Sequence, residues 1–202
     1  IYDPTEGRIL INGVDLREIS LKEWISYIGY MSQEYSRYDF KIKEAIAMGR
    51  VEEGVNEGKV RHVSELAQVS EFVEKLEHKY DHMLGVEFGG IEPSFGQSQK
   101  IAIAKMLYRS ALVTIFDEPT ASVDAESEAK IFEALNKIPS MTAIMISHDF
   151  STISECDDII VLQDGKVKES GDHETLMKKG GEYAKLYRLQ AEKFEEGVKQ
   201  AK

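Results

Sequence analysis

The sequence predicts an α/β fold in which helices cover a parallel sheet and a helical insertion interrupts it. Short apolar strands are expected at residues 27–31, 112–116 and 142–146, with helical segments between them. Strands that are apolar along their whole length are typical of a parallel sheet buried on both faces. Residues 42–108 show helical periodicity only, so we expect them to form the insertion.

The bulk composition fits one globular domain. The chain has 202 residues, of which 42% are hydrophobic, and this is enough to bury one core. The formal net charge of -11 opposes non-specific binding to nucleic acid, so no nucleic-acid partner is expected. The single cysteine, Cys156, cannot form an internal disulfide, and we expect a buried, inert thiol.

The N-terminal segment contains two local signals. Residues 8–11 are apolar and precede Asn12-Gly13, a pair that tolerates positive φ at both turn positions and predicts a hairpin. Ser20, with Glu23 three residues later, predicts a capping box at the start of a short helix. The first expected strand follows that helix.

Helices and strands continue to alternate after residue 112. Asp124 is a preferred N-cap residue type and predicts a helix over residues 125–136. The Asp164-Gly165 pair separates two short apolar segments and predicts a second hairpin. The last segment is a charged helix whose expected apolar stripe, interrupted by Gln190, is formed by Tyr183, Leu186, Tyr187 and Phe194.

Two adjacent acids, Asp117 and Glu118, come directly after an apolar strand. Ligands of open α/β sheets bind beyond the carboxyl ends of the strands, which makes this pair a candidate site. In phosphoryl transfer one such carboxylate can hold Mg²⁺, and the next can orient or deprotonate the attacking water. Taken alone, the pair is equally consistent with an acidic turn in solvent.

Polar residues also follow the other two expected strands. His148 comes after the strand at 142–146, at the same predicted edge, where it could donate a hydrogen bond to a terminal phosphate. Gln33 follows the strand at 27–31 and could meet a metal-bound water. Individually, each has a plainer interpretation, a structural histidine and an ordinary turn residue.

A further candidate lies at the start of an apolar helix. Ser94 and Gly96 precede the apolar run at residues 101–107. A helix N-terminus with this composition offers backbone N–H groups to an anion. The alternative is a simply capped helix without a ligand.

Taken in chain order, these residues resemble the motif set of ABC transporter ATPases. Gln33 matches the Q-loop, and the signature motif is matched by Ser94, Gly96 and Gln97. Asp117 matches the Walker B aspartate, and Glu118 matches the catalytic glutamate that follows it. Asp124 matches the D-loop, and His148 matches the switch histidine. The resemblance implies a P-loop NTPase fold with a RecA-like parallel sheet core. It implies one domain over residues 1–202, with a helical signature subdomain at about 40–110 and the core and C-terminal helices at 1–39 and 111–202.

The resemblance also implies ATP and Mg²⁺ as cofactors and a second ABC ATPase domain as partner. Asp117, together with Gln33, would help to hold Mg²⁺. Glu118 would polarise the attacking water, and His148 would contact the γ-phosphate. In this family ATP is hydrolysed between two head-to-tail domains, so some residues would act on the nucleotide held by the partner or at the interface: Ser94, Gly96, Gln97 and Asp124.

The flanking segments resemble exporters more than importers. They are residues 2–16, which resemble the part after the Walker A helix, and residues 171–187, which resemble the exporter ending. In exporters, membrane helices usually precede the ATPase on the same chain. The chain is therefore expected to be a fragment that acts at the cytoplasmic face of the cell membrane with a transmembrane domain. The exported substrate, and whether the paired ATPase domain is identical, stay open.

Two departures from the family pattern support a second interpretation. No Gly-x-x-x-x-Gly-Lys-[Ser/Thr] phosphate loop occurs in these residues, and Phe95 replaces a glycine inside the signature motif. The alternative is therefore a truncated or degenerate domain that acts only as an interaction module or is a gene remnant. Soluble ABC proteins of DNA repair or translation are a weaker alternative, because a long coiled-coil insertion is missing.

Overall fold

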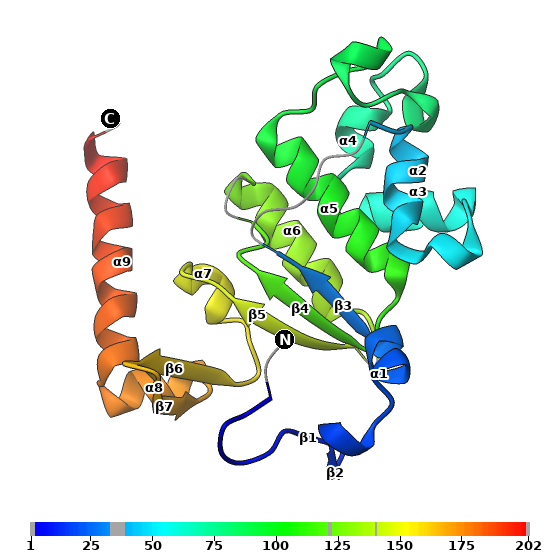
Figure 1. The fold of residues 1–202 in the computed structure, drawn as a ribbon. Coiled ribbons are helices and arrows are strands. Elements are labelled where there is room, and N and C mark those ends of the chain that lie inside the picture. Colours follow the sequence, from blue (N-terminus) through cyan, green and yellow to red (C-terminus); the bar gives the residue numbers. More distant parts are fainter. Residues whose placement is uncertain (1–2, 33–38, 121–122, 140, 201–202) are drawn as a thin grey trace. The chain divides into compact units, whose positions relative to one another are not determined.

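The computed structural model describes residues 3–32, 39–120, 123–139 and 141–200 (Figure 1). The chain forms two compact units, Ile1–Ile146 and Ser147–Lys202. The first unit holds the parallel sheet and the helical insertion, and the second holds a hairpin with three helices.

The first unit is built on a parallel sheet with the order β3-β4-β5, formed by Ile28–Met31, Val113–Asp117 and Thr142–Ile146. Met31 pairs with Phe116, and Asp117 pairs with Ile146. The three strands run in the same direction, so their carboxyl ends meet at one edge. The predicted parallel sheet is confirmed.

The N-terminal hairpin is also confirmed. Strands β1 (Leu10–Ile11) and β2 (Val14–Asp15) are joined by Asn12 and Gly13, whose φ angles of 49° and 84° are both positive. A short 3₁₀ helix, η1 (Leu16–Glu18), and helix α1 (Leu21–Tyr27) lead into β3.

The capping box predicted at Ser20 is wrong. Ser20 is the N-cap of α1, but its side chain makes no capping hydrogen bond. Its carbonyl still accepts from the N–H of Trp24 at 2.9 Å, so the helix begins where expected. Ser20 is exposed, and water can satisfy the first N–H groups of an exposed helix.

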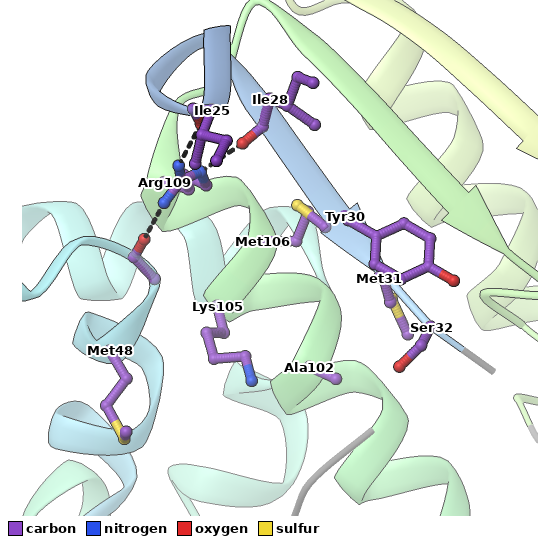
Figure 2. Close-up of a pocket in the computed structure, with 11 residues that line it drawn as sticks. Ile25, Ile28, Tyr30, Met31, Ser32, Met48, Ala102, Lys105, Met106 and Arg109 are labelled. Carbon is purple, nitrogen blue, oxygen red and sulfur yellow. Dashed lines mark hydrogen bonds between the residues drawn. The ribbon is translucent and has the colours of Figure 1, made fainter. Parts of the chain in front are cut away.

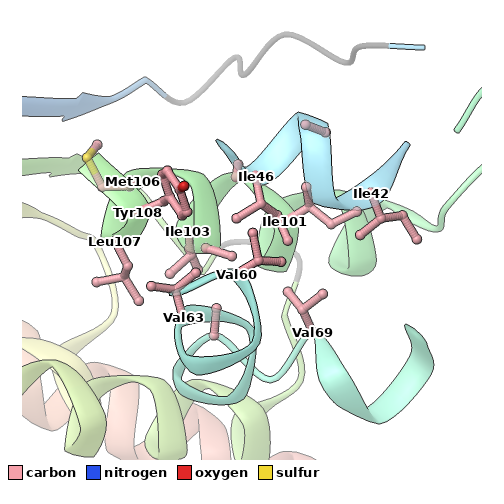
Figure 3. Close-up of a cluster of buried hydrophobic side chains, with 14 of the residues drawn as sticks. Ile42, Ile46, Val60, Val63, Val69, Ile101, Ile103, Met106, Leu107 and Tyr108 are labelled. Carbon is pink, nitrogen blue, oxygen red and sulfur yellow. The ribbon is translucent and has the colours of Figure 1, made fainter. Parts of the chain in front are cut away.

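The insertion between β3 and β4 is helical, as predicted. Its elements are α2 (Ile42–Ala47), η2 (Met48–Glu53), α3 (Glu57–Leu66), α4 (Ser70–Val73), η3 (Lys79–Asp81), η4 (Val86–Phe88) and α5 (Phe95–Arg109). Helix α6 (Ala125–Asn136) follows β4. Figure 3 shows apolar side chains of α2, α3 and α5 packed in one cluster that includes Ile46, Val60 and Ile103.

Helix α5 carries polar side chains at its C-terminal end that connect it to other elements. Tyr108 is fully buried, and its hydroxyl donates to the carbonyl of Gly54 at 2.7 Å and accepts from the N–H of Asn56 at 3.0 Å. Arg109 donates to the carbonyls of Ile25 at 2.7 Å and Ile28 at 2.5 Å. These contacts join α5 to the start of α3, to α1 and to β3.

The second unit confirms the second predicted hairpin. Strands β6 (Ile159–Gln163) and β7 (Lys166–Gly171) are antiparallel, and Asp164 and Gly165 have φ angles of 51° and 72°. The helices are α7 (Phe150–Ile153), α8 (His173–Lys179) and α9 (Glu182–Gln200). The expected thiol, Cys156, is half-buried against the core of this unit, and burial raises its pKa.

The apolar stripe predicted on α9 is wrong in part. Tyr183 is buried and Tyr187 packs against the same cluster, but Leu186 is exposed. The side chain of Phe194 lies outside the described residues. Gln190 continues the packed face instead, because its Oε1 accepts a 3.0 Å hydrogen bond from the N–H of Phe150.

A close backbone approach at Gly49 yields a stability prediction. A Cβ at this position would lie 2.0 Å from the carbonyl oxygen of Lys105, so Gly49→Ala must push η2 away from α5. Overpacking of this kind typically costs about 1–3 kcal/mol. Gly58→Ala is the matched control, because its Cβ would meet only Asn56 Oδ1 at 3.5 Å. Thermal unfolding should show a lower Tm for Gly49→Ala and an unchanged or higher Tm for Gly58→Ala, and equal Tm values would contradict the predicted packing.

Candidate active site

The two predicted acids lie at the carboxyl edge of the sheet. Asp117 is the last residue of β4, Glu118 follows it, and both are half-buried. On one side, the register partner of Asp117 is Ile146, the last residue of β5. On the other side, β3 ends at Met31, but Gln33 lies outside the described residues.

The main chain of Glu118 is held on both sides. Its N–H donates to the carbonyl of Ile146 at 2.9 Å, and its own carbonyl accepts from Gln99 Nε2 at 3.2 Å. Its φ angle of 50° lies in the left-handed region, which is uncommon for a residue with a side chain. Such conformations persist where surrounding contacts determine them, and they cluster at functional sites.

A tyrosine that the sequence did not single out lies next to Asp117. The hydroxyl of Tyr30 donates to Asp117 Oδ2 at 3.4 Å. Tyr30 belongs to β3 and is paired with Ile115, so its position follows from the strand register. This contact links the middle of β3 to the carboxylate at the end of β4.

The start of α5 forms a complete capping box. Ser94 Oγ accepts from the N–H of Gln97 at 3.2 Å, and Gln97 Oε1 accepts from the N–H of Ser94 at 2.9 Å. Ser94 is exposed, and Gly96 is half-buried in the first turn. Phe95 is 68% exposed, so its ring extends into solvent from the first turn of the helix.

Asp124 is the N-cap of α6, as predicted. Its carboxylate accepts a hydrogen bond from the N–H of Ser127 at 2.9 Å. Hydrogen bonds from the backbone and the side chain of Ser127 lower the pKa of Asp124 to about 2. Lys100 of α5 lies beside this cap: its Nζ donates to Ser127 Oγ at 2.6 Å and lies 3.7 Å from Asp124 Oδ2. The beginning of α6 is therefore attached to the buried side of α5.

His148 belongs to the second unit, two residues after the end of β5. Its side chain is exposed. The next residue, Asp149, is the N-cap of α7, where its carboxylate accepts from the N–H of Ser151 at 2.9 Å. The hydroxyl of Ser147 accepts from the N–H of Asp149 at 3.0 Å, so a local turn supports the histidine.

A groove of about 490 Å³ lies between the sheet and the insertion. Figure 2 shows its lining, which comes from α1, β3, η2 and α5 and includes Ile25, Met31, Met48 and Met106. The hydrogen bonds of Arg109 to the carbonyls of Ile25 and Ile28 join α5 to α1 and to β3. The groove also includes Ser32, the residue before Gln33.

Comparison with known proteins identifies the family. The ABC transporter family model matches residues 1–121, which is more than half of the chain. This chain belongs to the ABC transporter family. The predicted P-loop NTPase fold and the resemblance to exporters are both confirmed by similar proteins.

Similar ABC proteins align with nearly the whole chain. An uncharacterized ABC transporter ATP-binding protein of Sinorhizobium fredii is 36% identical over 94% of this chain and 32% of its own length. An ATP-dependent lipid A-core flippase of Alcanivorax borkumensis is 36% identical over 93% of this chain and 32% of its own length. A bacterial Atm1-family ABC exporter, solved with ATP bound, superposes with a TM-score of 0.85 at 31% identity over 94% of this chain and 33% of its own.

The chain thus spans about a third of the length of these ABC relatives. Within the part of the chain that the structure describes, no helix combines the length and the apolar character that a membrane span needs.

Asp117 and Glu118 are suited to a magnesium ion whose other ligands are water and the phosphates of a nucleotide. Among the described residues, no three Asp, Glu, His or Cys side chains gather where they could share a metal ion. Mg²⁺ commonly binds proteins through one or two carboxylates and completes its shell with water and substrate phosphates. Asp117, half-buried at the end of β4, can supply one such oxygen ligand.

Sequence reasoning missed Tyr30, Gln99 and Lys100 as parts of this region. The two α5 residues are nearly buried, with 3% and 9% exposure. The available signal was their place at the start of an apolar helix, where a polar side chain on the packed face requires a partner. The sequence did not indicate which partner each would find.

The N-cap of α6 yields a prediction about stability and pH. Asp124→Ala should lower the free energy of unfolding by about 1 kcal/mol, as is typical of N-cap removal, whereas Asp124→Asn should retain most of it. Because folding lowers the pKa of Asp124 from 3.8 to about 2, the contribution of its charge is complete above 3.8 and lost as the pH falls through about 2. Urea unfolding at several pH values measures this.

The matched control for the cap is Glu133→Ala. Glu133 is an exposed residue of α6 that pairs with Lys137, and exposed helical pairs contribute only about 0.3–0.5 kcal/mol. If Asp124→Ala were no more destabilising than Glu133→Ala, the capping contact would not stabilise α6.

Proposed function

We propose that this chain is the ATP-hydrolysing motor of an ABC exporter that couples hydrolysis to export across a membrane. The observation that carries the proposal is the pair Asp117 and Glu118 at the carboxyl edge of the parallel sheet, with the main chain of Glu118 held by Ile146 and Gln99. A carboxylate whose backbone is fixed in this way is suited to direct one water molecule. The exporter relatives support the same activity.

The proposed roles follow the chemistry of phosphoryl transfer. Asp117 would help to hold Mg²⁺, which would supply positive charge to the phosphate, and Glu118 would accept a proton from the attacking water or orient it. His148 donates a hydrogen bond to the γ-phosphate. Gln33 would help to hold the metal ion and would couple the site to the transmembrane domain.

The second half of the site is proposed to act on a partner domain. Ser94, Gly96 and Gln97 form the first turn of α5, where backbone N–H groups and the helix dipole favour an anion. ATP held by a second ABC ATPase domain would meet this turn. The cap residue Asp124 would then lie at the contact between the two domains.

A membrane-spanning partner is proposed for the groove beside β3. The groove is lined largely by apolar side chains and includes Ser32, directly before the coupling candidate Gln33. A transmembrane domain that pressed into it would act on β3 and α5 together. We place the domain at the cytoplasmic face of the cell membrane for this reason.

The two acids should separate binding from chemistry in the full-length protein. Glu118→Gln keeps the side-chain shape but cannot accept a proton, so ATP binding should persist while turnover falls by about 10²–10⁴-fold, the usual effect of losing a general base. Asp117→Asn should instead weaken ATP binding and its Mg²⁺ dependence together. Phosphate release and equilibrium nucleotide binding, measured on both variants, test this.

The outcomes identify which part of the proposal fails. Normal turnover by Glu118→Gln would remove the water-activating role from this residue. A wild-type full-length protein that binds ATP without hydrolysing it would favour the alternative, an interaction module.

Phe95 yields a separate prediction, because its 68% exposed ring lies at the turn proposed to face the partner's nucleotide. Phosphate must approach helix N–H groups to about 2.9 Å, and a ring that points toward the partner obstructs that approach. Phe95→Gly should therefore raise ATP turnover several-fold in a self-paired full-length protein. Phe88→Gly, a change at another exposed ring outside this turn, is the control. An unchanged rate in Phe95→Gly would remove the argument for an impaired signature site.

A further inference from the structure

We propose that Gln99 is a positioning residue that holds the main chain of Glu118 and connects it to the signature end of α5. The inference rests on the proposed function, because it assigns Glu118 to water activation. It adds a link between the two half-sites of one chain that lies outside the motif residues.

The first observation is the burial and bonding of the Gln99 amide. Gln99 is 3% exposed, and its Nε2 donates to the carbonyl of Glu118 at 3.2 Å. A buried amide without hydrogen bonds destabilises the folded state, so the hydrogen bond of Gln99 to this carbonyl is strongly favoured. The contact is made to the main-chain carbonyl of Glu118.

The second observation is the conformation that this contact supports. Glu118 has a φ angle of 50°, a region that is unfavourable for a residue with a Cβ. Its N–H is held by the carbonyl of Ile146 at 2.9 Å. With Gln99 on the carbonyl side, the peptide groups on both sides of the residue are restrained. Loss of the Gln99 donor would leave only one of these two restraints.

The third observation is that the same turn of α5 is attached elsewhere. Lys100, the next residue, donates through Nζ to Ser127 Oγ at 2.6 Å, at the capped start of α6. Gln99 lies five residues after Ser94, about one and a half helical turns. The first turn of α5, Ser94 to Gln97, is called the signature turn. A movement of the signature turn is therefore transmitted along a rigid helix to Glu118 and to α6.

The consequence is communication between two nucleotides within one chain. The signature turn meets the nucleotide of the partner domain, whereas Glu118 acts on the nucleotide of its own domain. Closure of the signature turn on the partner's nucleotide adjusts the position of Glu118 at the nucleotide of its own domain. Gln99 transmits this adjustment through the hydrogen bond from its Nε2 to the carbonyl of Glu118.

The test uses the full-length protein with Gln99→Met, which keeps the length of the side chain and removes the donor. A misplacement of about 1 Å can cost roughly 10²-fold in rate, so we expect kcat to fall by about 10- to 100-fold with an unchanged KM for MgATP. Gln99→Glu replaces the donor with a carboxylate and should also lower kcat. The control is Ile103→Val, another buried change in α5, which should lower Tm slightly and leave kcat unchanged.

A double-mutant cycle separates positioning from general damage. If Gln99 acts through Glu118, then adding Gln99→Met to Glu118→Gln should not lower the residual single-turnover rate further. A multiplicative loss in the double variant would overturn the proposal, and so would a normal kcat in a folded Gln99→Met. If neither Gln99 variant shows a melting transition, Gln99 is a structural residue of the core and the proposal is also overturned.

Failure of this inference is distinct from failure of the proposed function. In the first case the wild type hydrolyses ATP and Glu118→Gln does not, but the Gln99 variants behave as the Ile103→Val control. In the second case Glu118→Gln itself turns over normally, or the wild type is inactive.

Discussion

Helix α5 is buried around most of its circumference, and the rest of the first unit depends on that burial. Ser98 to Ala104 and Met106 to Tyr108 are all buried, and several of these side chains are polar. An unsatisfied buried polar group costs roughly 1–3 kcal/mol, so each of them needs a partner inside the protein. Partners are supplied by Glu118, directly after β4, by Ser127 of α6 and by Gly54 before α3, which places those segments around α5.

The same constraint connects packing with the proposed chemistry. The exposed first turn of α5 carries Ser94, and the buried turn that follows carries Gln99 and Lys100. One helix thus carries the turn that we propose to meet a partner's nucleotide, and through Gln99 it also supports the main chain of Glu118. In this arrangement the stability of the core and the geometry of the site are difficult to change independently.

Local signals in the sequence were accurate where a feature depends on neighbouring residues. The turn at Asn12-Gly13 and the cap at Asp124 follow from backbone preferences, and both are present. The prediction at Ser20 was wrong because an exposed helix end does not require its cap. The prediction at Leu186 was wrong because periodicity defines one face of a helix but does not indicate which edge of that face other elements will cover.

The sequence alone determined the family, the parallel sheet and the order of the candidate site residues, because these depend on residue types and their spacing. The roles proposed for those residues stay predictions. Only the tertiary structure decided that Gln99 meets Glu118, that Lys100 meets Ser127 and that Tyr30 meets Asp117. A buried amide or ammonium group requires a partner, but its residue type does not specify which one. That choice depends on which distant segments the fold brings within about 3 Å, the range of a hydrogen bond.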